Sequence, residues 1–320
     1  MKVIRSLSEV PRPAPRITAA IGSFDGVHAG HREIMTRVVR EARSSGGAAV
    51  VFTFDPHPRA VLQAPRSPRI LTPLDEKIGI LASLGIELTV VLRFDRAFAS
   101  MPAEEFVRVW LLDRFRPGLL VVGYDFRLGR GREGNGAMLK TFGEGHGFAV
   151  DVVDPYLIDG RPVKSTWIRD EIEAGEVRTA ARLLRRFHAV AGTVVPGDSR
   201  GKRLGFPTAN LSIDEEGKLW PGDGVYAVFA EVGEDLIEGA ANLGVRPTFG
   251  PGGARRLEVH LFGFEGDLEG ARLRVHFVEK VRGETRFRSP EDLARRIRAD
   301  CDRAAEILAA ADRKFLFTRP

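Results

Sequence analysis

The pattern of apolar residues changes beyond the middle of this 320-residue chain, and that change limits the folds it can adopt. In the first part, apolar runs that suit buried strands alternate with segments that repeat apolar residues at helical spacing. Such alternation is typical of a parallel sheet covered by helices. The predicted strands are 17–24, 48–54, 86–94 and 118–126, and the predicted helices are 30–47, 74–85 and 102–115.

Beyond residue 187, β-rich runs follow one another with Gly, Pro and Asp clusters between them and no helical pattern. This spacing predicts a small antiparallel barrel or sandwich. A long amphipathic helix follows at 289–312, and Ser289 with Asp292 suits the cap of its first turn. The predicted β segments are 188–195, 224–232, 236–244, 255–264 and 271–281.

The change of pattern predicts two domains, with the boundary near 184–188. The first, 1–185, is an α/β domain with a parallel sheet, which two short helical segments near 165–186 complete. The second, 186–320, is a small antiparallel β-barrel with a C-terminal helix. No repeat and no low-complexity linker separates them, so we expect the two domains to be closely joined.

Composition restricts the setting in which the chain works. No run approaches the 18 or so apolar residues of a membrane span, and the N-terminal sixteen residues lack the apolar core of a secretory signal. Cys301 is the only cysteine, which excludes an internal disulfide and a cysteine-based zinc site. These features favour a cytoplasmic protein that contacts no membrane. We expect a monomer or a weak homo-oligomer.

The net charge of +5 does not by itself indicate a nucleic-acid partner. Basic residues are interspersed with acidic ones, whereas a surface that follows a nucleic-acid backbone usually shows blocks of one sign. Binding of small phosphorylated substrates explains a modest positive excess equally well. We therefore expect small-molecule partners and no nucleic acid.

Two histidines, His28 and His31, flank Gly30 where the first predicted strand gives way to a helix. A zinc site would need further ligands, and no His/Cys cluster supplies them. Two interpretations stay open: the histidines only cap the helix, or they donate hydrogen bonds to an anion at the helix N-terminus. Gly30 would leave room for a phosphate to approach the backbone.

Three further segments favour the anion site, because they also flank predicted strands or a helix start. They are TFDPHP at 53–58, the glycine- and arginine-rich run at 121–135, and KSTWIR at 164–169. Ser165, Thr166 and Arg169 place two hydroxyls and a guanidinium at a predicted helix start, which suits phosphate.

The run GSFDGVHAGH at 22–31 resembles the signature of the bacterial flavin adenylyltransferases, and GYDFRLGRGREGN and STWIR resemble two later motifs in the same order. The resemblance implies a Rossmann-like nucleotidyltransferase domain in which the phosphate of FMN attacks the α-phosphorus of ATP and pyrophosphate leaves with Mg²⁺ assistance. His28 and His31 would then be catalytic. ATP and its phosphates would bind Ser23, Phe24, Gly30, Asp125, Ser165, Thr166 and Arg169, and the flavin would bind Phe54, Pro56, His57, Pro58 and Tyr124.

The second domain contains a different candidate phosphate site at 194–211. Its three glycines, Gly197, Gly201 and Gly205, free the backbone to approach phosphate, and Lys202 lies among basic neighbours. The segment lacks the ending of a Walker loop, so a simple basic hairpin is an equal alternative. Thr208 and Asn210 alternate along an extended segment, and their oxygens suit Mg²⁺.

This segment, including GFPTAN with Phe206 and Pro207, resembles the riboflavin kinase module, as do later runs in family order. The resemblance implies that Glu258 is the general base that accepts the proton of the riboflavin 5′-hydroxyl. It also implies that Arg282 and Glu284 contact the flavin. Taken without its motif, Glu258 would be an ordinary outward-facing acid on a strand.

The resemblance covers nearly the whole chain and identifies it as similar to the bifunctional riboflavin kinase/FAD synthetases. It implies that ATP phosphorylates riboflavin to FMN and that a second ATP converts FMN to FAD. Two alternatives are a single active module and a binding regulator without catalysis. The chain departs from the family pattern at Lys164, at Leu128 and at 183–188, where Arg185, Arg186 and Phe187 replace the usual junction.

Overall fold

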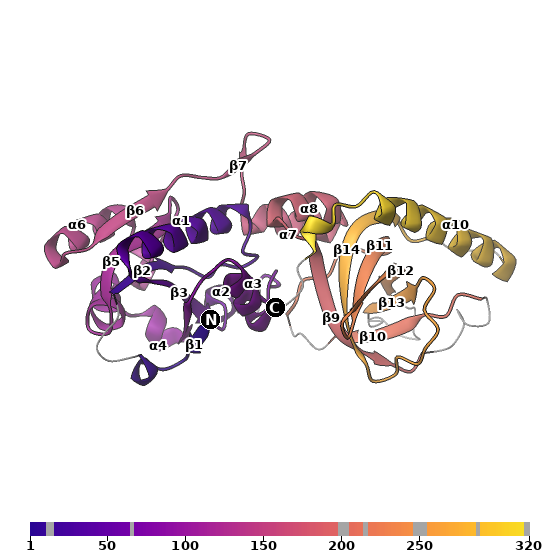
Figure 1. Cartoon of the computed structure of the whole chain (residues 1–320), viewed down its shortest axis with the longest axis horizontal. Coiled ribbons are helices and arrows are strands. Elements are labelled where there is room, and N and C mark those ends of the chain that lie inside the picture. Colours follow the sequence, from indigo (N-terminus) through magenta and orange to yellow (C-terminus); the bar gives the residue numbers. More distant parts are fainter. Residues whose placement is uncertain are drawn as a thin grey trace. The chain divides into compact units, whose positions relative to one another are not determined.

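The computed structural model describes residues 1–10, 16–64, 67–197, 205–213, 217–245, 255–285 and 289–316. The chain forms two compact units, one comprising Met1–Ser165 and the other beginning at Thr166 (Figure 1). The helices of 165–184 thus belong mainly to the second unit, whereas the sequence assigned them to the first domain.

The first unit contains a six-stranded parallel sheet with the order β1-β4-β3-β2-β5-β6. The central strands are almost entirely buried and consist of apolar runs, as a sheet covered on both faces requires. The chain moves outward from β2 through β3 to β4 and then returns to β5 on the other side of β2. The strands are β1 (Lys2–Ile4), β2 (Arg16–Ile21), β3 (Ala48–Asp55), β4 (Leu88–Arg93), β5 (Arg116–Gly123) and β6 (Ala149–Val153).

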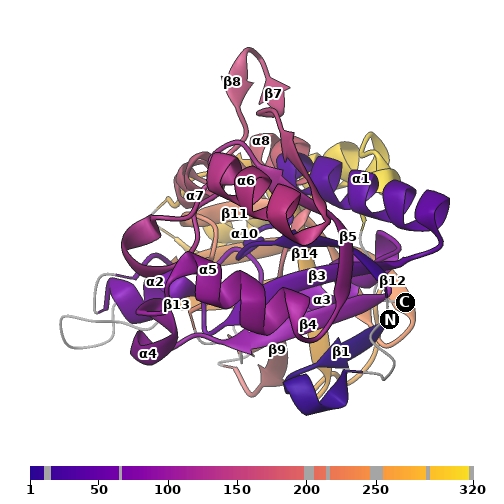
Figure 2. The same cartoon turned by 90° about the vertical axis from the view of Figure 1, so that its left-hand side faces the viewer.

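Helix α1 (Ala29–Ser45) covers the centre of this sheet, where it packs against β2, β3 and β5. Its buried residues include Ile34, Met35 and Val38, which repeat at helical spacing, and it ends at Gly46 with φ of 65°. A short hairpin of β7 (Leu157–Ile158) and β8 (Arg161–Pro162) stands away from the sheet (Figures 1 and 2). The other helices are η1 (Leu7–Glu9), α2 (Pro58–Leu62), α3 (Leu74–Ser83), α4 (Arg96–Ala99), α5 (Ala103–Phe106), η2 (Val107–Leu112), η3 (Arg130–Arg132) and α6 (Gly136–His146).

The second unit contains a closed antiparallel barrel with the order β10-β13-β12-β11-β14-β9. Alternate residues of each strand fill its interior, among them Tyr226, Val228, Leu257, Val259 and Phe277. Its strands are β9 (His188–Val195), β10 (Ala209–Ile213), β11 (Gly224–Val232), β12 (Asp235–Val245), β13 (Arg255–Leu261) and β14 (Arg272–Arg282). Its helices are α7 (Ser165–Ala174), α8 (Val177–Leu184), α10 (Pro290–Ala309) and η4 (Arg313–Phe315).

The predicted fold class, a parallel α/β domain followed by an antiparallel barrel with a C-terminal helix, is confirmed. In the described part of the chain, no helix has the length and apolar character needed to cross a membrane.

An ion pair joins the last helix to the barrel. Arg282 at the end of β14 donates to both carboxylate oxygens of Asp300 on α10, at 2.9 and 3.0 Å, and Arg296 lies 3.1 Å from the same carboxylate. The side chains of Arg282 and Asp300 are only 13% and 6% exposed. Removing one member of such a pair leaves the other charge poorly solvated. The guanidinium of Arg282, assigned to flavin from the sequence, therefore has a structural partner here.

We expect Asp300→Asn to lower the free energy of unfolding of the second unit by about 3 kcal/mol, because Arg282 then remains partly buried without a counter-charge. Urea unfolding of the full chain, followed by circular dichroism, measures this loss. Glu306→Gln on the same helix is the matched control, because Glu306 and its partner Arg303 are 67% and 58% exposed. That change should cost less than about 1 kcal/mol. Equal losses in both variants would show that the ion pair of Arg282 and Asp300 does not stabilise the second unit.

Candidate active sites

Strands β3 and β4 are added on one side of β2, and β5 and β6 on the other. The loops that follow β2 and β5 therefore diverge and leave a crevice at the carboxyl edge of the sheet. The loop after β2 contains two non-glycine residues with left-handed backbone, Phe24 (φ 46°) and Val27 (φ 38°). Each such residue costs about 1–3 kcal/mol and persists only where its surroundings enforce it. The buried carboxylate of Asp25 accepts hydrogen bonds from the backbone N–H groups of Leu71 and Thr72, both at 3.0 Å.

The two histidines lie at the start of α1 with their rings stacked, the centroids 3.6 Å apart and the planes 19° from parallel. His28 is the N-cap, and its Nδ1 accepts a hydrogen bond from the backbone N–H of His31 at 3.4 Å. That bond places the proton of a neutral His28 ring on Nε2. His28 therefore caps α1, which was one of the two interpretations left open by the sequence. The other interpretation, anion binding by the histidines, stays a prediction.

His31 has a buried ring nitrogen that could accept or donate a further hydrogen bond. Its Nδ1 is buried and finds no hydrogen-bond partner among the described residues. Burial holds the pKa of His31 well below the usual histidine value, and the neighbouring charges of His28 and Lys77 lower it further. A neutral imidazole with an unpartnered buried nitrogen gains from a polar ligand. An arriving phosphate would also favour its protonation.

Beside these histidines, the carboxyl edge of the sheet opens into a pocket of about 590 Å³, lined by Ser23, Phe24 and His31 and by loops after β3, β4 and β5. Aromatic rings form one wall: Phe54 meets Phe94 and Phe98 at centroid distances of 5.6 and 6.0 Å, and Phe98 meets Phe106 at 5.9 Å. Such a wall suits a planar aromatic ligand.

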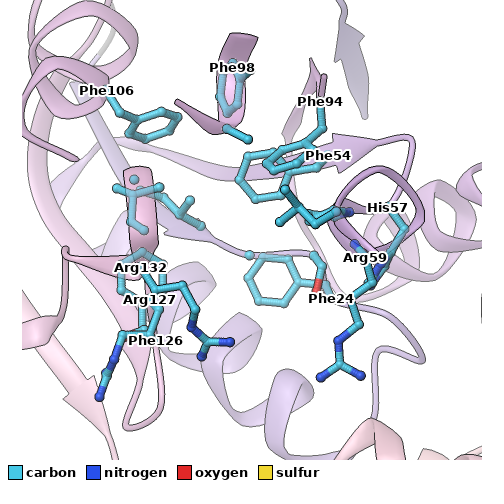
Figure 3. A pocket seen from close by; sticks show the side chains of 18 of the residues that line it. Phe24, Phe54, His57, Arg59, Phe94, Phe98, Phe106, Phe126, Arg127 and Arg132 are labelled. Carbon is cyan, nitrogen blue, oxygen red and sulfur yellow. Dashed lines mark hydrogen bonds between the residues drawn. The ribbon is translucent and has the colours of Figure 1, made fainter. Parts of the chain in front are cut away.

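Arginines occupy another part of the same pocket. Figure 3 shows Arg59, Arg127 and Arg132 below the aromatic rings. All three are exposed, and no ion pair involves them in the described part of the chain. Asp125 is the only acid among the described residues of the lining. The pocket therefore combines an apolar wall with an excess of positive charge, as an anionic aromatic ligand requires.

Half of the fourteen residues assigned to this site from the sequence line the pocket, and His28 is not among them. Those that line the pocket are Ser23, Phe24, His31, Phe54, His57, Pro58 and Asp125. Tyr124 is 39% exposed, with the ammonium of Lys164 5.5 Å from its ring centroid, and neither it nor Pro56 lines the pocket. Gly30 lies close to His28, whose Cε1 would be 3.3 Å from an added Cβ.

The sequence reasoning missed the aromatic wall and the arginine at the start of α2. Phe94 ends the third predicted strand, and Phe98 and Phe106 follow it within twelve residues. That clustering of phenylalanines was the available signal. Arg59 directly follows the segment TFDPHP at 53–58 and is not part of it.

The residues of the STWIR motif differ in their surroundings. The hydroxyl of Ser165 donates to the backbone carbonyl of Asp25 at 2.9 Å, so it supports the loop after β2. Thr166 and Arg169 belong to the second unit, where Arg169 is buried. Their assignment to phosphate stays a prediction. Lys164, a departure from the family pattern, lies 3.9 Å from the carboxylate of Asp125.

The second unit presents a row of polar side chains across three neighbouring strands. Glu258 of β13 is directly opposite Asn210 of β10 on one side and Asn242 of β12 on the other. Its neighbours Leu257 and Val259 are buried in the barrel, so Glu258 points away from the interior. Cross-strand neighbours of this kind have side chains within reach of one another. Asn242 was not singled out from the sequence.

The segment before β10 is fixed next to this row. Nδ1 of His260, two residues beyond Glu258, donates to the carbonyl of Pro207 at 2.7 Å, and its ring meets Phe206 edge to face at 5.6 Å. A Cβ at Gly197 would overlap the side-chain amide of Asn210, so this glycine allows the two segments to approach.

A pocket of about 450 Å³ adjoins this row, and Gly197, Pro207, Thr208 and Asn210 all line it. Gly205 has φ of 86°, which favours glycine. Glu284 lies against Gly244, where an added Cβ would meet its carboxylate. Gly201 and Lys202 lie outside the described residues, so their predicted contacts with phosphate stay predictions.

Comparison with known proteins gives two family matches that divide the chain in the same way as the two sites. Residues 11–167 match the FAD synthetase family, and residues 184–308 match the riboflavin kinase family. A bifunctional riboflavin kinase/FMN adenylyltransferase from Escherichia coli (strain K12) is 37% identical over 304 residues, covering 94% of this chain and 96% of that protein. A protein of the same name from Bacillus subtilis (strain 168) is 33% identical, covering 88% and 89%.

A solved structure has a similar fold over the whole chain. The crystal structure described as a macrolide-efflux protein from Streptococcus pneumoniae has a TM-score of 0.86 and 29% identity, covering 97% of this chain and 99% of that one. Both units are therefore found together in one solved relative.

The lowered pKa of His31 makes stability depend on pH. The unfolded chain binds a proton near the ordinary histidine value of about 6.5, whereas the folded state resists it, so this stabilisation is present above that pH and is lost as the pH falls below it. We expect the melting temperature of the first unit to drop less between pH 8 and pH 5 in His31→Gln than in the unchanged protein.

Differential scanning calorimetry of the full chain measures these melting temperatures. His146→Gln on α6 is the control, because His146 is exposed and should leave the pH dependence unaltered. An identical drop in His31→Gln and the unchanged protein would show that His31 does not carry the effect.

Proposed function

The chain belongs to the family of bifunctional riboflavin kinase/FMN adenylyltransferases, and from this premise we propose which residues carry its two reactions. It phosphorylates riboflavin to FMN with ATP, and it adenylylates FMN to FAD with ATP. Its substrates are therefore small molecules. The observation that best supports a residue assignment is the pocket where an aromatic wall and three arginines meet His31, whose ring stacks on His28.

In adenylyl transfer, a phosphate oxygen of FMN attacks the α-phosphorus of ATP, and the bond to pyrophosphate breaks. The nucleophile is already an anion, so no protein base is needed and the protein contributes position and charge. The aromatic wall would hold the isoalloxazine ring and the arginines would hold phosphate. His28 and His31 would donate hydrogen bonds to the reacting phosphates, aided by the N-terminus of α1.

In the kinase reaction, the 5′-oxygen of riboflavin attacks the γ-phosphorus of ATP, the bond to ADP breaks, and Glu258 accepts the hydroxyl proton. The position of Glu258 between Asn210 and Asn242, on the outer face of the barrel, supports this role. An outward-facing acid between two amides can meet a substrate without entering the apolar interior.

Thr208 and Asn210 offer Mg²⁺ a hydroxyl and an amide oxygen beside one pocket, which fits its preference for oxygen ligands. When bound, Mg²⁺ would neutralise charge on the ATP phosphates. Among the residues that the structure describes, no group of three His, Cys, Asp or Glu side chains could hold a metal ion by itself. The cation would therefore depend on ATP for most of its ligands.

We further propose that the catalytic domains are 1–185 and 186–320, that Arg282 and Glu284 border the flavin of the kinase site, and that the protein is a cytoplasmic monomer or weak homo-oligomer. The two family matches, which leave 168–183 between them, support a division in that region.

Separate variants should separate the two reactions. We expect Glu258→Gln to reduce FMN formation at least about a hundredfold, the usual range for loss of a general base, and to leave FMN-to-FAD conversion intact. His28→Ala combined with His31→Ala should do the reverse. Chromatography of flavins after incubation with riboflavin or FMN, ATP and Mg²⁺ measures both reactions. If either variant lowered both activities equally in folded protein, the assignment of one reaction to each unit would be wrong.

Gly197→Ala tests the placement of Asn210. The new methyl group would displace the Asn210 amide, so we expect kcat/KM for riboflavin phosphorylation to fall about tenfold or more while FAD formation from FMN is unchanged. Gly145→Ala is the control, because nothing lies within 4 Å of a Cβ there. A kinase activity equal to that of the control would exclude a role for this contact.

A further inference from the structure

Lys77 on α3 is a buried lysine whose ammonium contacts the loop that follows β2, residues 22–28. Lys77 is only 4% exposed. Its Nζ donates to the backbone carbonyl of Ser23 at 2.8 Å and to Oγ1 of Thr53 at 3.3 Å. Burial lowers the pKa of Lys77, and the carboxylates of Asp25 and Asp55 oppose that effect. A buried ammonium is costly, so its retention here calls for a reason beyond packing.

The contacts of Lys77 form half of a reciprocal connection between two segments. The side chain of Lys77 binds the backbone at Ser23, and the side chain of Asp25 binds the backbone at Leu71 and Thr72, just before α3. These bonds hold the loop 22–28 from both directions. The same loop contains the left-handed residues Phe24 and Val27, so its conformation depends on such restraints.

The loop in turn determines where the site residues lie. Ser23, Phe24 and His31 line the pocket, and His28, the last residue of the loop, caps α1. The charge of Lys77 also reaches His31, whose pKa it lowers together with burial and the charge of His28. Lys77 therefore influences both the position and the protonation of groups that face the phosphates.

We propose that Lys77 is a positioning residue for adenylyl transfer, which holds the loop 22–28 through the Ser23 carbonyl so that His28 and His31 meet the phosphates. Neither the sequence motifs nor the pocket lining includes it. The inference rests on adenylyl transfer taking place in the first unit. A purely structural role predicts lower stability with an unchanged adenylylation rate in the folded protein.

The test compares Lys77→Met, Lys77→Arg and the unchanged full-length protein. We expect Lys77→Met to lower kcat/KM for FMN adenylylation about tenfold or more, because displaced reacting groups cost rate. Riboflavin phosphorylation should be unchanged. Lys77→Arg should recover part of the rate, since a cation returns to the same place. Lys140→Met on α6 is the control, because Lys140 is exposed.

A second measurement does not depend on activity. In NMR titrations of protein with isotope-labelled histidine, the midpoint of His31 should move to higher pH in Lys77→Met, because a neighbouring positive charge is gone. It should stay near its usual value in Lys77→Arg. If Lys77→Met does not fold, Lys77→Gln takes its place, because its shorter side chain also loses the bond to the Ser23 carbonyl. An adenylylation rate equal to that of the unchanged protein would then overturn the proposal.

Three results separate the possible failures. An unchanged His31 midpoint together with an unchanged adenylylation rate in folded Lys77→Met would reject the positioning role. A loss of stability with an unchanged adenylylation rate in the folded protein would reduce Lys77 to a structural residue. Absence of FAD formation in the unchanged protein would instead contradict adenylyl transfer itself.

Discussion

Parallel pairing of β2 with β3 on one side and β5 on the other is the constraint on which the first active site depends. The chain places β3 and β4 on one side of β2 and then returns to place β5 on its other side. The loops at the carboxyl edge therefore diverge and leave a crevice. Every described residue of the pocket lies at or beyond the carboxyl end of β2, β3, β4 or β5, apart from two on α1. Residues far apart in sequence meet there.

Buried polar groups then convert this crevice into a defined site. Asp25 and Lys77 are both nearly inaccessible. Asp25 accepts hydrogen bonds from the backbone just before α3, and Lys77 donates to the carbonyl of Ser23 and to Oγ1 of Thr53. Local strain at Phe24 and Val27 is maintained by these contacts. The second unit uses another device. Its closed barrel directs every second side chain outward, which aligns Asn210, Glu258 and Asn242 in one row.

Particular residues show why some elements could be predicted and others not. The strands at 48–55 and 188–195 consist mostly of apolar and β-branched residues, so their sequence is sufficient. Strand β1 has only three residues, Lys2–Ile4, and its pairing with β4 supplies what its sequence lacks. Helix α6 contains three glycines, which weaken any helical pattern, and its cap at Asn135 and its packing on β6 compensate.

The sequence by itself determined the two periodicities, and therefore the two folds, and it predicted the site motifs at His28, Thr208 and Glu258, whose roles stay predictions. These depend on local spacing and on residue type, which are complete in the chain. Only the tertiary structure decided that Phe94, Phe98 and Arg59 share a pocket with His31, that Arg282 pairs with Asp300, and that Lys77 lies beneath Ser23. Each of these contacts depends on strand order or on burial, and neither is a property of neighbouring residues.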